Sequence, residues 1–279
     1  MTCAVCKEEL DPVLQAAGSH PNCFPFMEID EGDPFANRLK TTLIEVILWA
    51  QSEAMNPRGK QALIGPSELG AVCDRRIAYR IAGVEKVNTE MDPWPMVVGT
   101  AVHTWLERAF TVWNEANTRT PEWLTETRLS LDQVIQGTSD LYSTEFKAVI
   151  DWKGAGPDVM KKVRRDGPPL GYQVQAQLYG YGFSLQGLPV EKVCLVFLPR
   201  AGWLKDMYVW CQDYDQGVAL SAIDRLYRIA QNLINLDTST YPDKWNKVPA
   251  TPSNDCGWCP YYSPSSENEI ATDRGCPGR

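Results

Sequence analysis

Histidine and positive charge are both scarce in this chain. It has 2 histidines, and its 27 lysines and arginines are outnumbered by 35 aspartates and glutamates, which gives a net charge of -8. An acidic protein repels nucleic-acid phosphates, so the composition argues against general nucleic-acid affinity and leaves such binding to local basic patches. Both histidines also fall in the metal-ligand patterns described below, which leaves no histidine base for a serine or cysteine nucleophile.

Long apolar runs are also missing. No stretch reaches membrane-spanning length, and no succession of charged, apolar and small residues marks a signal peptide, so we expect a cytoplasmic protein with no membrane partner. In that compartment thiols stay reduced, and clustered cysteines bind metal more often than they form disulfides. What the chain does have is 9 cysteines and, over 279 residues, a hydrophobic content of 44% that supports a substantial core.

Two ligand pairs lie near the start of the sequence, each with two residues between its members. Cys3 and Cys6 form the first pair, and His20 and Cys23 form the second. Three thiolates and an imidazole can enclose one tetrahedral zinc ion, and about 25 residues cannot hold a core without such a staple. The spacing predicts a structural zinc module, with scattered thiols and a surface histidine as the alternative.

Helical spacing dominates the next segment. After a linker at 24–34, apolar residues recur at helical intervals through 35–54 and predict an amphipathic scaffold helix. Ser67 is a suitable N-cap for a second helix, which carries Cys73 among three arginines. We expect those arginines, Arg75, Arg76 and Arg80, to form a solvated face.

Residues 137–153 predict a tight antiparallel β-hairpin that carries two carboxylates and a lysine. With the turn centred on Glu145–Phe146, Asp140 lies opposite Asp151 with their Cβ atoms roughly 5 Å apart, and Lys153 points to the same face. Two acids that close repel each other unless a cation lies between them, which favours Mg²⁺ or Mn²⁺. The hairpin alone leaves an ordinary solvated face equally open, because acid-x-Lys triplets also arise by chance.

A histidine precedes the hairpin on a predicted helix. His103 lies in the apolar segment 95–110, whose pattern indicates a helix packed against the core. A lone histidine in that setting is more often a hydrogen-bonded core residue. The hairpin changes this weighting, because an imidazole from a helix beside a sheet edge can complete the coordination begun by Asp140 and Asp151.

The residues beyond the hairpin supply a basic cluster and further scaffold. A glycine- and proline-bounded loop at 154–169 holds four basic residues, Lys161, Lys162, Arg164 and Arg165. Their place directly after the hairpin favours contact with phosphates over an ordinary solvated charge run. We expect Cys194 and Cys211 to be core thiols. The pattern also predicts a helix at 172–184, strands at 190–199 and 204–211, and a helix packed on the sheet at 215–236.

The last cysteines suggest a second metal site. Cys256 and Cys259 are separated by two residues, and Cys276 follows after sixteen more. With the upstream Cys73 they make four thiolates, enough for a zinc ion or a [4Fe–4S] cluster. Spacing alone leaves both possibilities open.

Four short motifs occur in an order that resembles the RecB-like branch of the PD-(D/E)XK nucleases. They are Gly99-Thr100-Ala101-Val102-His103, Gly137-x-x-Asp140, Asp151-x-Lys153 and Gln175-x-x-x-Tyr179. The resemblance covers roughly residues 60 to 279 and leaves the zinc module outside it. It implies an α/β fold with a central mixed sheet flanked by helices.

The same resemblance implies roles for the motif residues. The implied ligands of a Mg²⁺ or Mn²⁺ ion are His103, Asp140, Asp151 and the carbonyl of Trp152. Lys153 would position the attacking water or stabilise charge at phosphorus. Gln175 and Tyr179 would line the DNA path on a following helix.

The cysteine pattern narrows the resemblance to the iron–sulfur subset, the Cas-four-type and AddB-like exonucleases. In that subset one distant upstream cysteine joins three near the C-terminus, which here would be Cys73 with Cys256, Cys259 and Cys276. The chain departs from the pattern, because the family usually places its last cysteine only a few residues after the pair. The pattern also occurs in bacteriophage proteins of this length.

We therefore expect a zinc module at 1–30, a helical region at 31–90, a nuclease core at 91–236 and an iron–sulfur segment at 237–279. The resemblance implies a Mg²⁺- or Mn²⁺-dependent exonuclease acting on single-stranded DNA ends. It would serve phage recombination, replication or interference with host DNA, with a recombination or CRISPR-adaptation partner. The alternatives are a non-catalytic adaptor that binds DNA ends and a related endonuclease.

Overall fold

The structure is a computed structural model that describes residues 34–50, 63–89, 92–118, 122–264 and 271–278. The predicted zinc ligands Cys3, Cys6, His20 and Cys23 lie outside these ranges. The chain divides into two compact units, which are Met1–Gln61 with Thr89–Val98, and Ala62–Asn88 with Gly99–Arg279.

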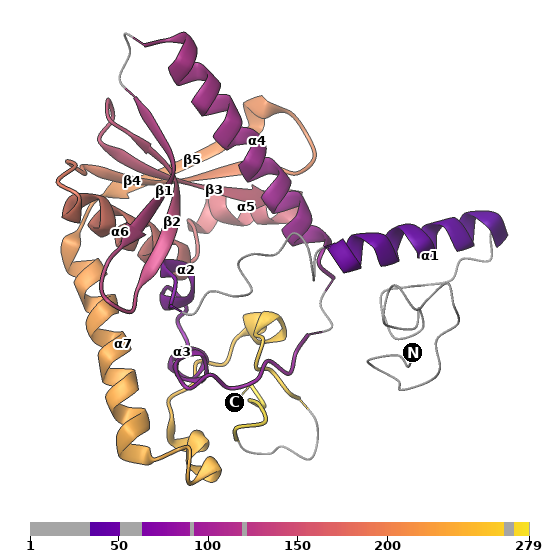
Figure 1. Cartoon of the computed structure of the whole chain (residues 1–279), viewed down its shortest axis with the longest axis vertical. Coiled ribbons are helices and arrows are strands. Elements are labelled where there is room, and N and C mark those ends of the chain that lie inside the picture. The colour runs from indigo at the N-terminus through magenta and orange to yellow at the C-terminus, as the bar shows by residue number, and fades with distance from the viewer. Residues whose placement is uncertain (1–33, 51–62, 90–91, 119–121, 265–270, 279) are drawn as a thin grey trace. The chain divides into compact units, whose positions relative to one another are not determined.

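A five-stranded mixed sheet forms the centre of the larger unit (Figure 1). The strands follow one another across the sheet in chain order, and all neighbours are antiparallel except β3 and β4. The parallel pair needs a crossover, which helices α5 and α6 supply. The predicted α/β class with a central mixed sheet is confirmed. The strands are β1 Trp123–Ser130, β2 Gln136–Ser143, β3 Ala148–Ala155, β4 Lys192–Pro199 and β5 Tyr208–Asp213.

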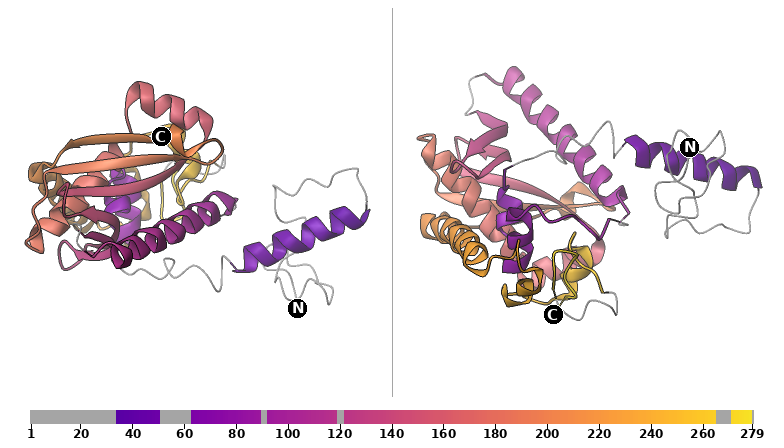
Figure 2. Two further views of the ribbon diagram at one scale, coloured as in Figure 1. Left: turned by 90° about the horizontal axis from the view of Figure 1, so that it is seen from above. Right: turned by 60° about the horizontal axis from the view of Figure 1, so that its bottom comes forward.

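Helices cover both faces of the sheet (Figure 2). Leu141 and Tyr142 are neighbours on β2 and therefore point to opposite faces. Leu141 packs with side chains of α4, Trp94–Ala116, whereas Tyr142 stacks on Phe183 of α6, Leu170–Leu185. Helix α7, Gln216–Leu236, packs chiefly on α6, and its buried side chains belong to the same core cluster as residues of β1 and β4.

Helix α1, Pro34–Trp49, belongs to the smaller unit. A helix was predicted here, but its apolar residues are not buried as scaffold residues would be. Leu39, Leu43 and Val46 are 47%, 54% and 58% exposed. None of the helices in the described ranges has the length and the apolar character that crossing a membrane requires.

Two short helices replace the single helix predicted after Ser67. Helix α2 runs over Pro66–Leu69, and α3 runs over Asp74–Ile81 with Cys73 at its N-cap. Ser67 lies inside α2 and does not cap it, because Gly65 holds the N-cap position and Pro66 starts the helix. Helix α2 ends at Gly70, which lies against the backbone of α6.

The predicted basic loop at 154–169 is mostly a helix, α5 over Pro157–Asp166. Pro157 starts it and Gly167, with φ of 78°, ends it, so the residues that suggested a loop are helix boundaries. Met160 and Val163 bury its apolar side. Strand β5 likewise begins later than predicted, at Tyr208, because Leu204–Asp206 form a 3₁₀ turn.

Cys194 and Cys211 form a disulfide and are not the free core thiols that were predicted. The antiparallel register of β4 and β5 sets these two residues directly opposite each other, with Cα atoms 4.2 Å apart. Strand alternation then leaves both side chains on one face. The pairing follows from a strand register that the sequence pattern did not reveal.

Helix α2 fits against both α6 and the sheet through glycines. A Cβ on Gly70 would lie 2.3 Å from the carbonyl oxygen of Gly171, at the start of α6. A Cβ on Gly137, in β2, would lie 2.6 Å from the ring of Pro66. These close approaches hold the segment before Cys73 against the elements that carry the candidate site.

Replacing Gly70 with alanine should destabilise the protein by about 1–3 kcal/mol, because the backbone of Gly171 has no room to yield to the new Cβ. Thermal unfolding followed by circular dichroism should show a midpoint several degrees lower. Gly99→Ala is the matched control, since a Cβ there meets nothing within 4 Å and alanine favours the helix. Equal midpoints for the two variants would contradict the α2–α6 contact.

Candidate metal centres

The hairpin of β2 and β3 has the register that the sequence predicts. Leu141 pairs with Ile150, and the pairing continues through Ser143 with Ala148. Just beyond these pairs, Asp140 accepts a hydrogen bond from the N–H of Trp152, the neighbour of Asp151, so the two strands bring the two acids near each other. The predicted hairpin and the position of its turn are confirmed.

Asp140 is held by a backbone amide and by an imidazole. Its Oδ2 accepts a hydrogen bond of 2.8 Å from the Trp152 N–H, and its Oδ1 lies 3.1 Å from Nδ1 of His103 on α4. Burial opposes a charge on His103, but the hydrogen bond to Asp140 and the surrounding carboxylates outweigh burial and raise the pKa of the imidazole. The predicted meeting of His103 with the hairpin is therefore present in the structure.

Asp151 and Lys153 form a buried ion pair. Asp151 is 2% exposed. Its Oδ2 accepts no hydrogen bond of standard geometry, but this oxygen lies 2.7 Å from Nζ of Lys153 and is paired with its charge. Burial raises the pKa of Asp151 against the pull of the ammonium. Burial alone would lower the pKa of Lys153, but the Asp151 carboxylate more than offsets it and raises that pKa.

Gln175 of α6 orients this ion pair. Its Nε2 donates to Oδ1 of Asp151 at 3.1 Å, and its Oε1 accepts from Nζ of Lys153 at 3.2 Å. Tyr179 lies one helical turn further on and is only 6% exposed. The ring of Tyr172, which is 39% exposed, lies 4.4 Å from Nζ of Lys153. Gln175 and Tyr179 thus lie beneath the carboxylates, and Tyr172 is the tyrosine that reaches the surface.

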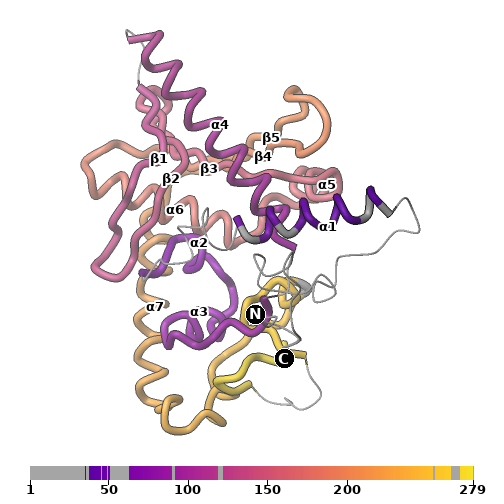
Figure 3. The backbone as a smooth tube through the Cα atoms, turned by 45° about the vertical axis from the view of Figure 1, so that its right-hand side comes forward, coloured from indigo at the N-terminus to yellow at the C-terminus, as the bar shows by residue number. Residues whose placement is uncertain are grey.

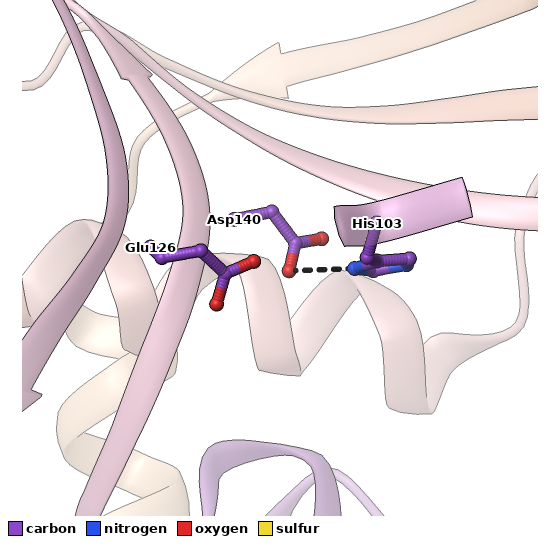
Figure 4. A group of neighbouring side chains, drawn as sticks. All are labelled: His103, Glu126 and Asp140. Atoms are coloured by element: carbon purple, nitrogen blue, oxygen red, sulfur yellow. Dashed lines mark hydrogen bonds and ion pairs between the residues drawn. The ribbon is translucent and has the colours of Figure 1, made fainter. Parts of the chain in front are cut away.

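Glu126 is a candidate ligand that the sequence did not single out. It lies in β1, where no strand was predicted, and the pairs Thr125–Leu141 and Thr127–Ser139 on either side of it bring it opposite Asp140. Figure 4 shows its carboxylate turned toward Asp140 and His103. The aromatic and threonine residues around Glu126 are typical of a strand and were the available signal.

The donor atoms of His103, Glu126 and Asp140 suit a hard divalent cation. Each residue has a potential ligand atom within 4.8 Å of those of the other two. Carboxylate oxygens with one imidazole nitrogen match the preferences of Mn²⁺, and carboxylates alone those of Mg²⁺. The residues of the site therefore fit such an ion.

The four cysteines predicted to share a site line one cavity of about 550 Å³. Cys73 comes from the start of α3, and the other three come from the segment after α7, which lies beside α3 (Figure 3). The last cysteine, despite its long spacing, faces the same space as the other three. Its cysteines are Cys73, Cys256, Cys259 and Cys276.

Polar groups around the cavity point at sulfur. The N–H groups of Thr251 and Ser253 lie 3.5 and 3.4 Å from the sulfur atoms of Cys73 and Cys256. Arg75 lies 3.5 Å from the sulfur of Cys276 and also donates to the carbonyl of Val248. Arg75 is only 5% exposed, so the predicted solvated face is wrong for this arginine. Such N–H groups stabilise thiolates that bind a metal or a cluster.

The sulfur atoms are spread more widely than one zinc ion requires. Within the described ranges, His103, Glu126 and Asp140 are the one group of three residues with potential ligand atoms within 4.8 Å of one another. No three of the four sulfur atoms therefore lie that close together. A tetrahedral zinc ion with Zn–S bonds of about 2.3 Å holds its sulfurs roughly 3.8 Å apart. A [4Fe–4S] cube attaches each thiolate to a different iron and so separates them further. Four cysteines around one cavity are the donors that either a zinc ion or a [4Fe–4S] cluster uses.

The basic cluster of α5 is largely engaged with its own surroundings. Lys161 lies 3.6 Å from Asp158, and Arg165 pairs with Asp166. Arg164 donates to the backbone carbonyl of Asp206 at 2.6 Å. Lys161 and Arg165 remain 80% and 75% exposed, so their charges face solvent.

No family model matches the chain, and no curated protein matches its sequence. Solved structures that are distantly similar to it include the following three. An alkaline exonuclease (LHK-Exo) from Laribacter hongkongensis is 12% identical with a TM-score of 0.45, over 64% of this chain and 91% of the exonuclease. SSO0001 is 18% identical with a TM-score of 0.43, over 83% of this chain and 96% of SSO0001. A phage related exonuclease from Haemophilus somnus 129PT is 14% identical with a TM-score of 0.38, over 58% of this chain and 81% of its own. Likenesses of this size do not transfer an activity, so the chemistry of this chain has to be inferred from its own side chains.

Proposed function

We propose that this chain is a metal-dependent deoxyribonuclease that hydrolyses phosphodiester bonds, acting as an exonuclease on single-stranded DNA ends. The observation that carries the proposal is the buried pair of Asp151 and Lys153, with their charged groups 2.7 Å apart, next to Asp140 and His103. Carboxylates gathered around a fixed ammonium suit a reaction in which negative charge develops at phosphorus. The motif order that resembles the PD-(D/E)XK nucleases supports the same reaction.

Each side chain of the site would have a distinct role in the reaction. A bound Mg²⁺ or Mn²⁺ would supply an activated water and neutralise charge at phosphorus. Asp140, Asp151, His103 and the carbonyl of Trp152 are the groups that would hold it. Lys153 carries its charge in a position fixed by Asp151 and Gln175, where it can stabilise a phosphoryl oxygen or orient the water. Gln175 is a positioning residue, because it touches the carboxylate and the ammonium and is itself buried.

We also propose that Cys73, Cys256, Cys259 and Cys276 hold a [4Fe–4S] cluster and that Cys3, Cys6, His20 and Cys23 hold a zinc ion. The cluster would link the start of α3, which precedes the five strands in the chain, to the segment after α7, which follows them. The cavity that all four cysteines line and the N–H groups directed at two of the sulfur atoms support a metal centre at this place, and the cysteine pattern of the resemblance favours the cluster. The zinc site rests on its sequence spacing.

The exposed basic residues of α5 would contact the DNA backbone. Helix α5 directly follows the strand that carries Asp151 and Lys153, so phosphates held by Lys161, Lys162, Arg164 and Arg165 would lie near the cleavage site. The resemblance extends to phage proteins, so we propose a role in recombination, replication or interference with host DNA, in the cytoplasm of the host. A recombination or CRISPR-adaptation protein is the partner we propose.

Wild-type protein, purified without oxygen, should degrade end-labelled linear single-stranded DNA in the presence of Mn²⁺. Lys153→Ala should lower the rate by about 10²–10³-fold, because a fixed charge at the reacting phosphate is lost. Asp151→Ala should abolish cleavage, because it removes a carboxylate of the cation site. The rate of label release measures both effects.

Lys147→Ala is the matched control for the lysine. It lies on the same hairpin, in a second acid-x-Lys triplet, but pairs with Glu191 at the surface and should cleave like the wild type. Wild-type protein that binds DNA and never cuts it with any divalent metal would replace the nuclease proposal with a DNA-end adaptor. Cleavage of circular DNA would identify an endonuclease, since a circle has no ends.

Protein prepared without oxygen should be brown and carry about four iron atoms per chain. Cys276→Ser should lower the iron content and the visible absorbance, because a cluster ligand is lost. Cys211→Ser is the control, since Cys211 pairs with Cys194 and not with the cavity, and its iron content should be unchanged. Colourless protein with two zinc ions would disprove the cluster.

Cys3→Ser should release one zinc ion per chain while cleavage stays largely intact, because the predicted zinc module precedes the nuclease core. Metal analysis of the purified variant, beside the cleavage assay, tests both halves of this expectation. Complete loss of activity in soluble, folded protein would show that the module takes part in the reaction.

A further inference from the structure

The loop that joins β4 to β5, residues 200–207, holds two large apolar side chains in solvent. Trp203 and Leu204 are adjacent in this loop, and each is 72% exposed. Single apolar side chains are common on protein surfaces, but two neighbouring ones that include a tryptophan are typical of a contact surface. The β4–β5 loop is therefore a candidate contact surface.

Hydrogen bonds hold the tip of the β4–β5 loop in place. The Asp206 carboxylate accepts from the Trp203 N–H at 3.3 Å, and the Asp206 N–H donates to the Trp203 carbonyl at 2.9 Å. Arg164 of α5 donates to the carbonyl of Asp206 at 2.6 Å. The loop thus presents Trp203 from a fixed backbone, which lowers the entropy lost when this side chain binds a partner.

Positive charge surrounds the two apolar side chains. Arg200 and Lys205 are exposed, and their side chains make no hydrogen bond or ion pair with any residue that the structure describes. The hydrogen bond from Arg164 brings the basic helix α5 beside the same loop. In a chain with a net charge of -8, such a local cluster favours an anionic partner. A single-stranded nucleic acid meets both requirements, because its phosphates are anionic and its unstacked bases offer apolar faces.

The β4–β5 loop begins close to the candidate active site. The parallel register of β3 and β4 pairs Lys153 with Phe197 and Ala155 with Pro199, and the Arg200 N–H donates to the Ala155 carbonyl at 2.9 Å. At about 3.3 Å per residue, the loop starts roughly 7 Å beyond Lys153 along the strand. Figures 1 and 3 show this loop and α5 at the same end of the sheet. A strand with one phosphate at Lys153 would therefore pass the loop within a few nucleotides.

We propose that the β4–β5 loop binds single-stranded DNA beside the active site, with Trp203 stacked on a base and Arg200 and Lys205 on the neighbouring phosphates. Leu204 extends the apolar surface on which the base rests. This inference rests on the proposed function, since it names how the substrate strand is held. Stacking of this kind tolerates any sequence, because every base has a π-face.

The experiment measures binding of a fluorescently labelled single strand of mixed sequence to the full chain, prepared without oxygen. Ca²⁺ replaces Mn²⁺, so that the strand is bound and not cut, and fluorescence anisotropy gives the affinity. Trp203→Ala should weaken binding by about 5- to 150-fold, because one base loses its stacking partner. Trp203→Phe should retain most of the affinity, whereas Trp203→Leu, which is apolar but has no ring, should resemble Trp203→Ala.

An abasic strand of the same length separates stacking from charge, because it keeps the phosphates and lacks the bases. Wild-type protein and Trp203→Ala should bind this strand equally. Trp113→Ala is the matched control, since Trp113 lies on α4, is 52% exposed and should leave both affinities unchanged. The proposal is overturned if Trp203→Ala binds the mixed strand like the wild type, or if it weakens binding of the abasic strand just as much.

The binding assay separates this inference from the nuclease proposal. Binding that depends on Trp203, by a protein that never cuts DNA with Mn²⁺, would support the stacking loop and refute the nuclease. Cleavage by the wild type, together with unchanged strand binding by Trp203→Ala, would support the nuclease and overturn the stacking loop.

Discussion

The repulsion between Asp140 and Asp151 is the constraint around which this structure is built. Two acids on adjacent strands stay close only where the protein opposes their charges. The Trp152 N–H and His103 do this for Asp140, while Lys153 and Gln175 do it for Asp151. Helix α4 carries His103, and helix α6 carries Gln175. The strands carry the carboxylates, and the side chains of the helices help to offset the repulsion between them.

The cysteine cavity and this site contact the same elements, helix α2 and the start of α6. Helix α2 sits between them, with Gly70 against Gly171 of α6 and Pro66 against Gly137 of β2. Tyr172 belongs to both regions, because it lines the cavity and its ring lies 4.4 Å from Nζ of Lys153. The cavity and the buried ion pair therefore share the first turn of α6 as a neighbour.

The hairpin and its facing acids could be predicted, because the turn position and strand alternation together fix an antiparallel register. Glu126 was missed because β1 is only partly buried and lacks a strong apolar alternation. Helix α5 was taken for a loop because Pro157 and Gly167 punctuate helices as well as turns. The four cysteines that the sequence groups together line one cavity, and their binding of a metal stays a prediction, because cysteine spacing carries no information on how far apart the sulfur atoms lie. That separation is set by the fold.

The order of the cavity's cysteines along the chain has a consequence for biosynthesis. Cys73 precedes the first strand, and Cys276 follows the last, 203 residues later (276 minus 73). At about 5–20 residues per second, roughly 10 to 40 s of translation separate the two. All five strands and the candidate carboxylates are therefore made before the cavity can close. The cavity is completed last, so a nascent or truncated chain carries the acids of the site before all four cysteines of the cavity are present.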